Sequence, residues 1–366
     1  MKKKVIFTLL IGFLTILPSL YSGLFLGAIR DPYGKINQLP VALVANSTDQ
    51  ASPIYQNIKS SKTFGFKQES LSQAKQELKA GKIFGILDFK ANFSKSLETF
   101  AMTQKPAQIE LFTSSGLNFS AQKILTTAAN QMVNDSNQAI AQSTIAKLNS
   151  AKMAVPTGIS QAIVLKTHDI SPVKNNAEGL APYFFALTLF VGGIIINQVF
   201  MRLFASKKGK FKTFYLWQFA LPAGMSLIQA AVMTLLTAVI FHFSVLSWTG
   251  LFGLLVLLAL TFDSLIIALN KLFPRFGVLV VLVILMLQTA MAGGSYPLAL
   301  SDKIFQMGSH FLPMTYGVLG LRKLFNLGMS DIWSQIWPLL IFLVIGQMLL
   351  ILAYFWHNHG ERILEK

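Results

Sequence analysis

Long apolar runs without a charged side chain occupy both ends of the chain. About 20 apolar residues in a helix cross the hydrocarbon core of a bilayer, and each of these runs is that long. The run Thr213–Phe262 is too long for one crossing, so it is predicted to form two helices with a turn near Phe241–Trp248. The pattern therefore predicts six membrane-spanning helices. The others are Val5–Ile29, Leu180–Met201, Phe276–Leu298 and Ile332–Trp356, and the second helix of the long run extends to about Asn270.

The first run, Val5–Ile29, follows three lysines, which is also the arrangement of a signal peptide. Its 25 residues are long for the apolar part of a signal peptide, and it lacks a clean A-x-A cleavage site. We therefore predict an uncleaved transmembrane helix over residues 1–29.

The segment 30–178 has a different pattern, in which short β-branched or aromatic runs alternate with helical ones. Such alternation indicates an α/β or α+β domain, and we predict the α/β form. Residues 179–366 then form a five-helix membrane domain. The expected strands are Val41–Ala45, Ile83–Phe89, Ile109–Thr113 and Ile163–Thr167, and the expected helices are Leu71–Ala80, Asn92–Phe100 (with Asn92 as N-cap) and Ser120–Ser150.

The composition agrees with a membrane protein, because 53% of the 366 residues are apolar and only 13% are charged. Soluble domains carry about 25% charged residues. The absence of cysteine excludes disulfide scaffolds, zinc fingers, iron–sulfur sites and thiol nucleophiles. The sequence also has neither a G-x-x-x-x-G-K-[ST] phosphate loop nor a G-x-S-x-G elbow. We expect no enzyme activity, no bound metal and no cofactor on this chain.

The net charge of +16 is a topology signal, since the basic residues outside the middle segment lie between apolar runs. With a cytoplasmic N-terminus, the inner short segments carry 12 Lys and Arg and the outer short loops carry three. This bias predicts that both termini lie inside and residues 30–178 outside a plasma membrane. It also argues against nucleic acid as a partner.

Three stretches resemble the YhgE/Pip family of membrane proteins. The first is Asp31-Pro-Tyr-Gly-Lys35 with Leu39-Pro-Val-Ala-Leu-Val44, and the second is Glu178-Gly-Leu-Ala-Pro-Tyr-Phe184. The third combines Gly293-Gly-Ser-Tyr-Pro297 with Phe311-Leu-Pro-Met-Thr-Tyr316 and Leu321-Arg322. Together they bracket nearly the whole chain in the family's order.

This resemblance places the chain among ABC-2 type membrane proteins, which have one helix, a large external domain and five further helices. It implies the permease subunit of an exporter, a homodimer or related heterodimer that moves an amphipathic or lipid-linked substrate outward, with ATP hydrolysed by a separate ATPase. It also suggests the membrane of a Gram-positive cell. The alternative is a non-transporting surface scaffold or receptor, as in phage infection or type VII secretion. That alternative is supported by the short stretch Met1–Lys4 before the first span, where ABC-2 exporters usually have a coupling helix.

Polar residues within the spans are the candidates for a transport path. Asp263 is the only formally charged residue within a span, and an acidic residue near a helix centre costs about 2.5–3.5 kcal/mol to insert. An ion pair with Lys271 is the alternative explanation of Asp263. Three glutamines, Gln229, Gln288 and Gln347, fall in mid-span, where interhelical hydrogen bonding is their commoner use.

Two other features are candidates for contacts with partners. Lys207, Lys208, Lys210 and Lys212 form a basic cytoplasmic loop that attracts anionic lipid or binds an ATPase. Gly23 and Gly27 form a small-residue face, either for a homodimer or for packing within the chain.

The segment Ser295–Asp331 is the longest stretch between the last two spans. The apolar positions of its second half recur at helical spacing around Arg322, which predicts an amphipathic helix at the outer interface or a re-entrant pair. In exporters that the chain resembles, such half-helices cap the substrate path. The candidate cap residues are Tyr296, Pro297, Pro313, Tyr316 and Arg322.

Overall fold

The computed structural model describes residues 21–24, 26–28, 31, 34–61, 63–150, 158–203, 210–327 and 331–364. Within the expected first span, residues 21–24 and 26–28 are helical, and the rest of Val5–Ile29 lies outside the described residues. The chain divides into two compact units. The α/β unit is Asp31–Gly179, and the membrane unit combines Met1–Arg30 with Leu180–Lys366.

The α/β unit is built on a five-stranded sheet of order β2-β1-β3-β4-β5. β1 (Pro40–Val44) pairs in parallel with β2 (Gly65–Gln68) and β3 (Gly85–Phe89). β4 (Ala107–Thr113) is antiparallel to β3 and parallel to β5 (Ile163–Asp169). All four predicted strands are present, whereas β2 was not predicted, because its four residues are too few to show an alternating pattern.

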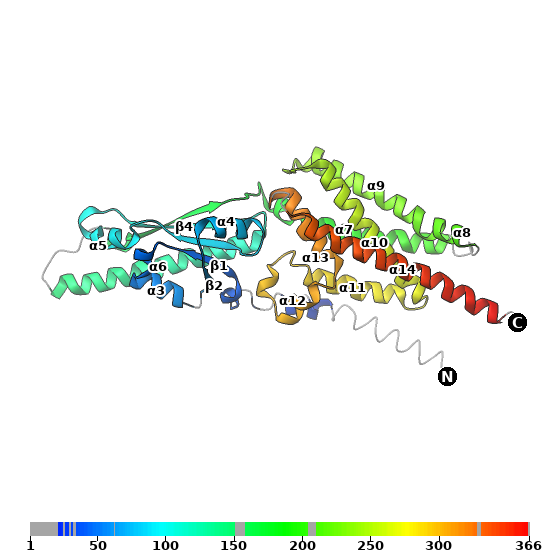
Figure 1. Cartoon of the computed structure of the whole chain (residues 1–366), viewed down its shortest axis with the longest axis horizontal. Helices are drawn as coiled ribbons and strands as arrows, with labels where there is room; N and C mark the ends of the chain where they lie inside the picture. The colour runs from blue at the N-terminus through cyan, green and yellow to red at the C-terminus, as the bar shows by residue number, and fades with distance from the viewer. Residues whose placement is uncertain are drawn as a thin grey trace, which may run out of the picture. The chain divides into compact units, whose positions relative to one another are not determined.

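Helices cover both faces of this sheet (Figure 1). A Cβ atom on Gly85 would lie 3.2 Å from Leu125 of α6, and Lys75 of α4 lies over the ring of Phe112, 4.7 Å from its centroid. Because Phe112 pairs with Ile86, the neighbour of Gly85, these two helices lie on opposite faces. The helices of the unit are α2 (Ser47–Gln50), α3 (Pro53–Ser60), α4 (Leu71–Lys79), α5 (Phe93–Thr103) and α6 (Phe119–Ser150), with 3₁₀ turns at Ile36–Gln38 and Ile159–Gln161.

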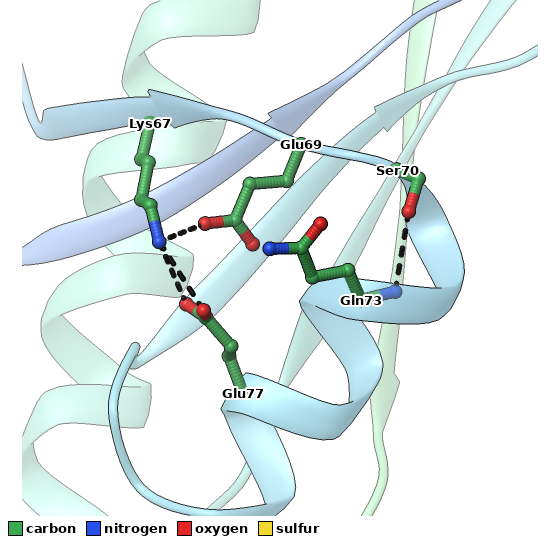
Figure 2. A network of polar contacts seen from close by, with 5 residues as sticks. All are labelled: Lys67, Glu69, Ser70, Gln73 and Glu77. Atoms are coloured by element: carbon green, nitrogen blue, oxygen red, sulfur yellow. Dashed lines mark hydrogen bonds and ion pairs between the residues drawn. The ribbon is translucent and has the colours of Figure 1, made fainter.

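Side-chain contacts hold the helices to the strands. Figure 2 shows Lys67 of β2 in an ion pair with Glu77 of α4 at 3.2 Å and in a second one with Glu69, while Ser70 caps α4. Asn137 of α6 pairs with both backbone groups of Ile163, at 2.8 Å each, and so anchors the first residue of β5. Polar side chains on these helices therefore have defined structural partners.

The N-terminus of α5 differs from its prediction. Asn92 is the N-cap residue, but it has a left-handed backbone and makes no capping hydrogen bond. The buried carboxylate of Asp49 accepts the hydrogen bond from the backbone N–H of Ser94 instead, at 2.8 Å. A residue distant in sequence has taken over the capping role.

Among the described residues, the membrane unit contains four helices that are long and apolar enough to cross a bilayer. They are α7 (Asn176–Leu203), the composite helix Phe211–Phe241, α10 (Trp248–Leu272) and α14 (Trp333–Leu364, apolar to Trp356). The composite helix consists of α8 (Phe211–Tyr215), a π turn at Leu216–Ala220, α9 (Leu221–Leu236) and a π turn at Thr237–Phe241. The chain is therefore a multi-pass helical membrane protein.

The central element of this unit is α10, which contacts α9, α11 (Gly277–Met291), α13 (Pro313–Arg322) and α14. Its 18-residue apolar window is 67% buried, against 22% for the corresponding windows of the composite helix and α14. A helix that is apolar on all sides is covered either by other parts of the protein or by lipid. α10 thus forms the core, and the outer helices leave apolar faces open to lipid.

Two expectations for this unit are corrected. The fifth span was expected at Phe276–Leu298, but α11 ends at Met291 and is about 22 Å long, short of the roughly 30 Å hydrocarbon core. The chain turns at Gly293, whose φ is +62°. α7 starts four residues before Leu180, because Asn175 and Glu178 form a capping box, with Asn175 Oδ1 accepting from Glu178 N at 2.9 Å.

Candidate functional site

Asp263 lies inside the helix bundle, on the side of α10 that faces α7 and α9. Its side chain is 1% exposed and accepts a hydrogen bond from the hydroxyl of Ser226. Among the described residues, its second oxygen, Oδ2, has no hydrogen-bond partner. Lys271, the alternative partner, places its Nζ atom 6.0 Å from the ring centroid of Phe214. Asp263 is therefore a buried carboxylate with spare hydrogen-bonding capacity.

The approach of α7 to this carboxylate depends on two glycines. A Cβ atom on Gly193 would lie 2.7 Å from Asp263 Oδ1, and a Cβ on Gly192 would overlap the side-chain amide of Gln229. Gln229 donates to the carbonyl oxygen of Thr188 at 3.3 Å, and among the described residues its buried Oε1 has no partner. The structure thus brings Asp263 and Gln229 together against one turn of α7.

Gln347 belongs to a different polar cluster, on the side of α10 that faces α14. Its amide donates to Ser264 Oγ at 2.8 Å, and its Oε1 accepts from the hydroxyl of Tyr215 at 3.0 Å. These bonds link α8, α10 and α14. Because both ends of the amide have partners, the geometry favours interhelical hydrogen bonding for Gln347.

Gln288 also has a structural partner. It is fully buried on α11, and its Oε1 accepts from the backbone N–H of Met314 at 3.0 Å, which caps the start of α13. The hydroxyl of Tyr183 on α7 reaches the carbonyl of Thr289, the next residue, at 3.4 Å. Gln288 therefore fixes the start of α13, and the predicted path residues divide among three places.

The segment Leu298–Leu327, between α11 and α14, combines a buried helix, α13, with a largely exposed one, α12 (Lys303–Ser309). It includes a 3₁₀ turn at Leu298–Leu300, α12, α13 and a π turn at Lys323–Leu327; residues 328–330 of the predicted cap lie outside the described ones. Arg322 is 5% exposed and donates to the carbonyls of Gly293 and Gly294 at 2.9 and 3.0 Å. Lys323, also buried, donates to the carbonyl of Asp331 at 2.7 Å. Both cations therefore bind backbone carbonyls inside the chain, and the interfacial or re-entrant placement of this helix stays a prediction.

The other candidate cap residues line the same segment. Pro313 is the first residue of α13, and Pro297 precedes the 3₁₀ turn. Tyr316 donates to the carbonyl of His310 at 3.0 Å. Tyr296 is half-buried in the loop between Gly294 and Pro297. These residues shape the connection between α11 and α13.

Comparison with known proteins decides what kind of molecule carries this bundle. Residues 3–356 match the family described as ABC-2 family transporter protein. The chain belongs to the ABC-2 transporter family. Membership supports a permease role, and permeases of this family generally work with an ABC ATPase.

One relative of this ABC-2 family protein is the "Uncharacterized protein YhgE" of Bacillus subtilis strain 168. The two are 28% identical over 195 residues, which are 52% of this chain and 25% of the relative. The match therefore covers only a quarter of that longer protein. It confirms the resemblance to YhgE inferred from the sequence motifs. No solved structure matches the chain.

Two partner-contact candidates of this ABC-2 protein are only partly described. Lys207 and Lys208 lie outside the described residues, whereas Lys210 precedes α8 and Lys212 lies in its first turn, both exposed. Gly27 packs within the chain, since a Cβ there would lie 3.4 Å from the ring of Phe305 on α12. A Cβ on Gly23 would have no atom of the described residues within 4 Å.

Several polar residues of the bundle were not predicted. Ser226 and Ser264 contact the predicted residues Asp263 and Gln347. Asn197, near the C-terminal end of α7, is 2% exposed and accepts from Asn270 Nδ2 at 2.9 Å. Neutral polar residues in an apolar run leave its hydropathy nearly unchanged, so only their rarity in such a run signals them.

Proposed function

We propose that this chain is the membrane subunit of an ABC-2 exporter that moves an amphipathic or lipid-linked substrate outward. The observation that carries the proposal is the family match over residues 3–356, nearly the whole chain. It favours transport over the surface scaffold. The buried site of Asp263, Ser226 and Gln229 supplies a polar position inside the bundle, which is typical of a pathway.

The proposed topology has six crossings, of which the short helix α11 is the fifth, with both termini in the cytoplasm and the α/β unit outside. Its support is the distribution of Lys and Arg, because all but three in the short segments then lie inside. In this arrangement Lys207–Lys212 faces the cytoplasm, where it binds the ATPase. The segment Leu298–Leu327, held by Arg322 on the carbonyls of Gly293 and Gly294, closes the external end.

The natural absence of cysteine makes this topology directly testable. Ser143→Cys places an exposed thiol on α6, and Thr213→Cys places one on α8. A membrane-impermeant maleimide added to intact cells should label only the first variant, and both variants after lysis. Labelling of Thr213→Cys in intact cells contradicts the proposed orientation.

The partner ATPase is tested by cross-linking in cells, pull-down of the tagged chain and mass spectrometry. A stoichiometric ABC ATPase is expected. Changing Lys207, Lys208, Lys210 and Lys212 to Gln should abolish its recovery, because the anchoring charges are removed. Changing Lys79, Lys82, Lys95 and Lys105, four exposed lysines of the α/β unit, removes the same charge and should have no effect.

Recovery of cell-surface proteins on 30–178 without an ATPase contradicts the exporter proposal and restores the scaffold alternative. The same cross-linking reports the dimer, since two copies of the chain should be linked at stoichiometric yield. An exclusively monomeric product removes the dimer from the proposal.

A further inference from the structure

The carboxylate of Asp263 is enclosed by oxygen atoms and backbone, with no compensating charge. No ion pair of the described residues includes Asp263, and its hydrogen-bond donor is the neutral hydroxyl of Ser226. Its side chain is 99% buried, and its Oδ2 atom is unpartnered among the described residues. Proteins pair or ligate buried charges, because an isolated charge in a low-dielectric interior is costly.

The neighbouring polar atoms have the character of ligands for a hard cation. The Oε1 atom of Gln229 is buried and, in the described part of the chain, accepts no hydrogen bond. Ser226 lies three residues earlier on α9, so both oxygens lie on the same face of that helix. Carboxylate, amide carbonyl and hydroxyl oxygens are the donors that hard cations prefer.

The glycine pair on α7 lets the backbone of this helix pack directly against the side chains of Asp263 and Gln229. Any Cβ on Gly193 would meet Asp263 Oδ1 and Ile266, and any Cβ on Gly192 would meet the Gln229 amide. α7 therefore presents only backbone where α9 and α10 present oxygen atoms. Asp263 and Gln229 thus each contact the glycine pair of α7, and Ser226 of α9 hydrogen-bonds to Asp263 of α10.

We propose that Asp263, Ser226 and Gln229 bind a monovalent cation of the sodium type between α7, α9 and α10. A single carboxylate compensates the charge of a monovalent ion, whereas a divalent ion would leave one uncompensated positive charge in the bundle. The site joins three helices, so the bound ion stabilises their packing. This inference goes beyond the proposed transport function. It does not depend on which substrate the permease moves.

The test is the thermal unfolding of the purified full chain in detergent, followed by the fluorescence of its five tryptophans, all in the membrane unit. Sodium chloride is titrated against N-methylglucamine chloride at constant ionic strength and pH. Because a ligand that binds only the folded state stabilises it by mass action, the unfolding temperature should rise saturably with sodium. An unfolding temperature that does not respond to sodium overturns the proposal.

Matched variants locate the effect. Ser226→Ala should raise the half-saturating sodium concentration about tenfold, which corresponds to about 1.4 kcal/mol. Ser264→Ala removes an equally buried hydroxyl from α10, on the Gln347 side, and should leave the sodium response unchanged. Gln229→Leu and Gln347→Leu form a second pair. Gln229→Leu should raise the half-saturating sodium concentration, and Gln347→Leu should leave it unchanged. Equal responses within both pairs contradict the site.

Asp263→Asn should abolish the sodium response, because the charge that attracts the ion is gone. If this variant does not fold, the serine and glutamine pairs still decide the question. A protonated carboxyl is the competing state of Asp263. In that case the unfolding temperature depends on pH and is indifferent to sodium, and this outcome also overturns the cation site.

Discussion

The α/β unit and the membrane unit achieve close packing by opposite means. In the α/β unit, large apolar side chains such as Leu87 and Leu111 are fully buried, and most charged side chains are exposed. In the helix bundle, the outer surface is apolar, and the interior contains glycine contacts and polar pairs. Lipid is as apolar as leucine, so helices in a membrane gain little from burying leucine side chains against one another. They associate through close packing and hydrogen bonds instead.

The comparison predicts that loss of volume damages the sheet most. Leu111→Ala, at a fully buried position of β4 opposite Leu87, should destabilise the α/β unit by about 2–5 kcal/mol, since it removes buried surface and leaves a cavity. Hydrogen exchange of the β4 amides in the full-length protein measures this loss. Val164→Ala, at a 37% exposed position of β5, is the control and should change exchange little. Equal protection in both variants contradicts the prediction.

Gain of volume should damage the bundle. Gly294→Ala places a methyl group in the ring of Tyr183. Either α7 or the loop after α11 must then move, at a cost of about 1–3 kcal/mol. Gly253→Ala on α10 is the matched control, because no atom of the described residues lies within 4 Å of the new Cβ. The temperature of thermal unfolding in detergent should fall for Gly294→Ala and stay unchanged for Gly253→Ala. A result in which both variants unfold alike removes the close-packing argument.

The smallest effect is expected from charge on the sheet surface. Lys90 Nζ lies 2.8 Å from Glu110 Oε2 and 3.4 Å from Asp88 Oδ2. Burial opposes ionisation of Glu110, but the hydrogen bond and charge of Lys90 prevail and lower its pKa below the usual 4.5. The pair therefore stabilises the fold above pH 4.5, and this contribution is lost as the pH falls through the lowered pKa.

Lys90→Gln should remove this stabilisation, about 0.2–1 kcal/mol for an exposed pair. Protection factors of the β4 amides should then decline at a higher pH than in the unmodified protein. Asp88 acts in the opposite direction, because burial raises its pKa, so its ionisation weakens the fold as the pH rises. Asp88→Asn is therefore the control, and it should not shift the acid decline upward. If Lys90→Gln does not change the pH at which the protection factors of the β4 amides decline, the ion pair does not have the proposed role.

Local patterns in the sequence anticipated much of the α/β unit. The four predicted strands and the long polar helix α6 are present, because alternating and helical periodicity is a local property. The helix α3 was overlooked although Ser52 and Pro53 are a cap and first-turn signal. The cap of α5 was assigned to Asn92, since the sequence cannot show that Asp49, 45 positions before Ser94, reaches its N–H.

The candidate site was anticipated only in part. The rarity of a charge in a span identified Asp263, but its neighbours Ser226 and Gly193 come from other helices. Gln288 was grouped with Asp263 as a path residue, whereas it caps α13. Which helix faces which polar residue depends on the rotation and depth of each helix, and hydropathy does not encode either.

Composition, hydropathy and short motifs by themselves determined that this is a multi-pass ABC-2 family membrane protein with an inserted α/β unit. These properties depend on transfer of each segment between water and lipid, which is a sum over its own residues. Only the tertiary structure decided that Arg322 is buried on the carbonyls of Gly293 and Gly294, and that Asp263 and Gln229 both pack against the glycine pair of α7. Those contacts join residues far apart in the chain, and their energy exists only when the helices have packed.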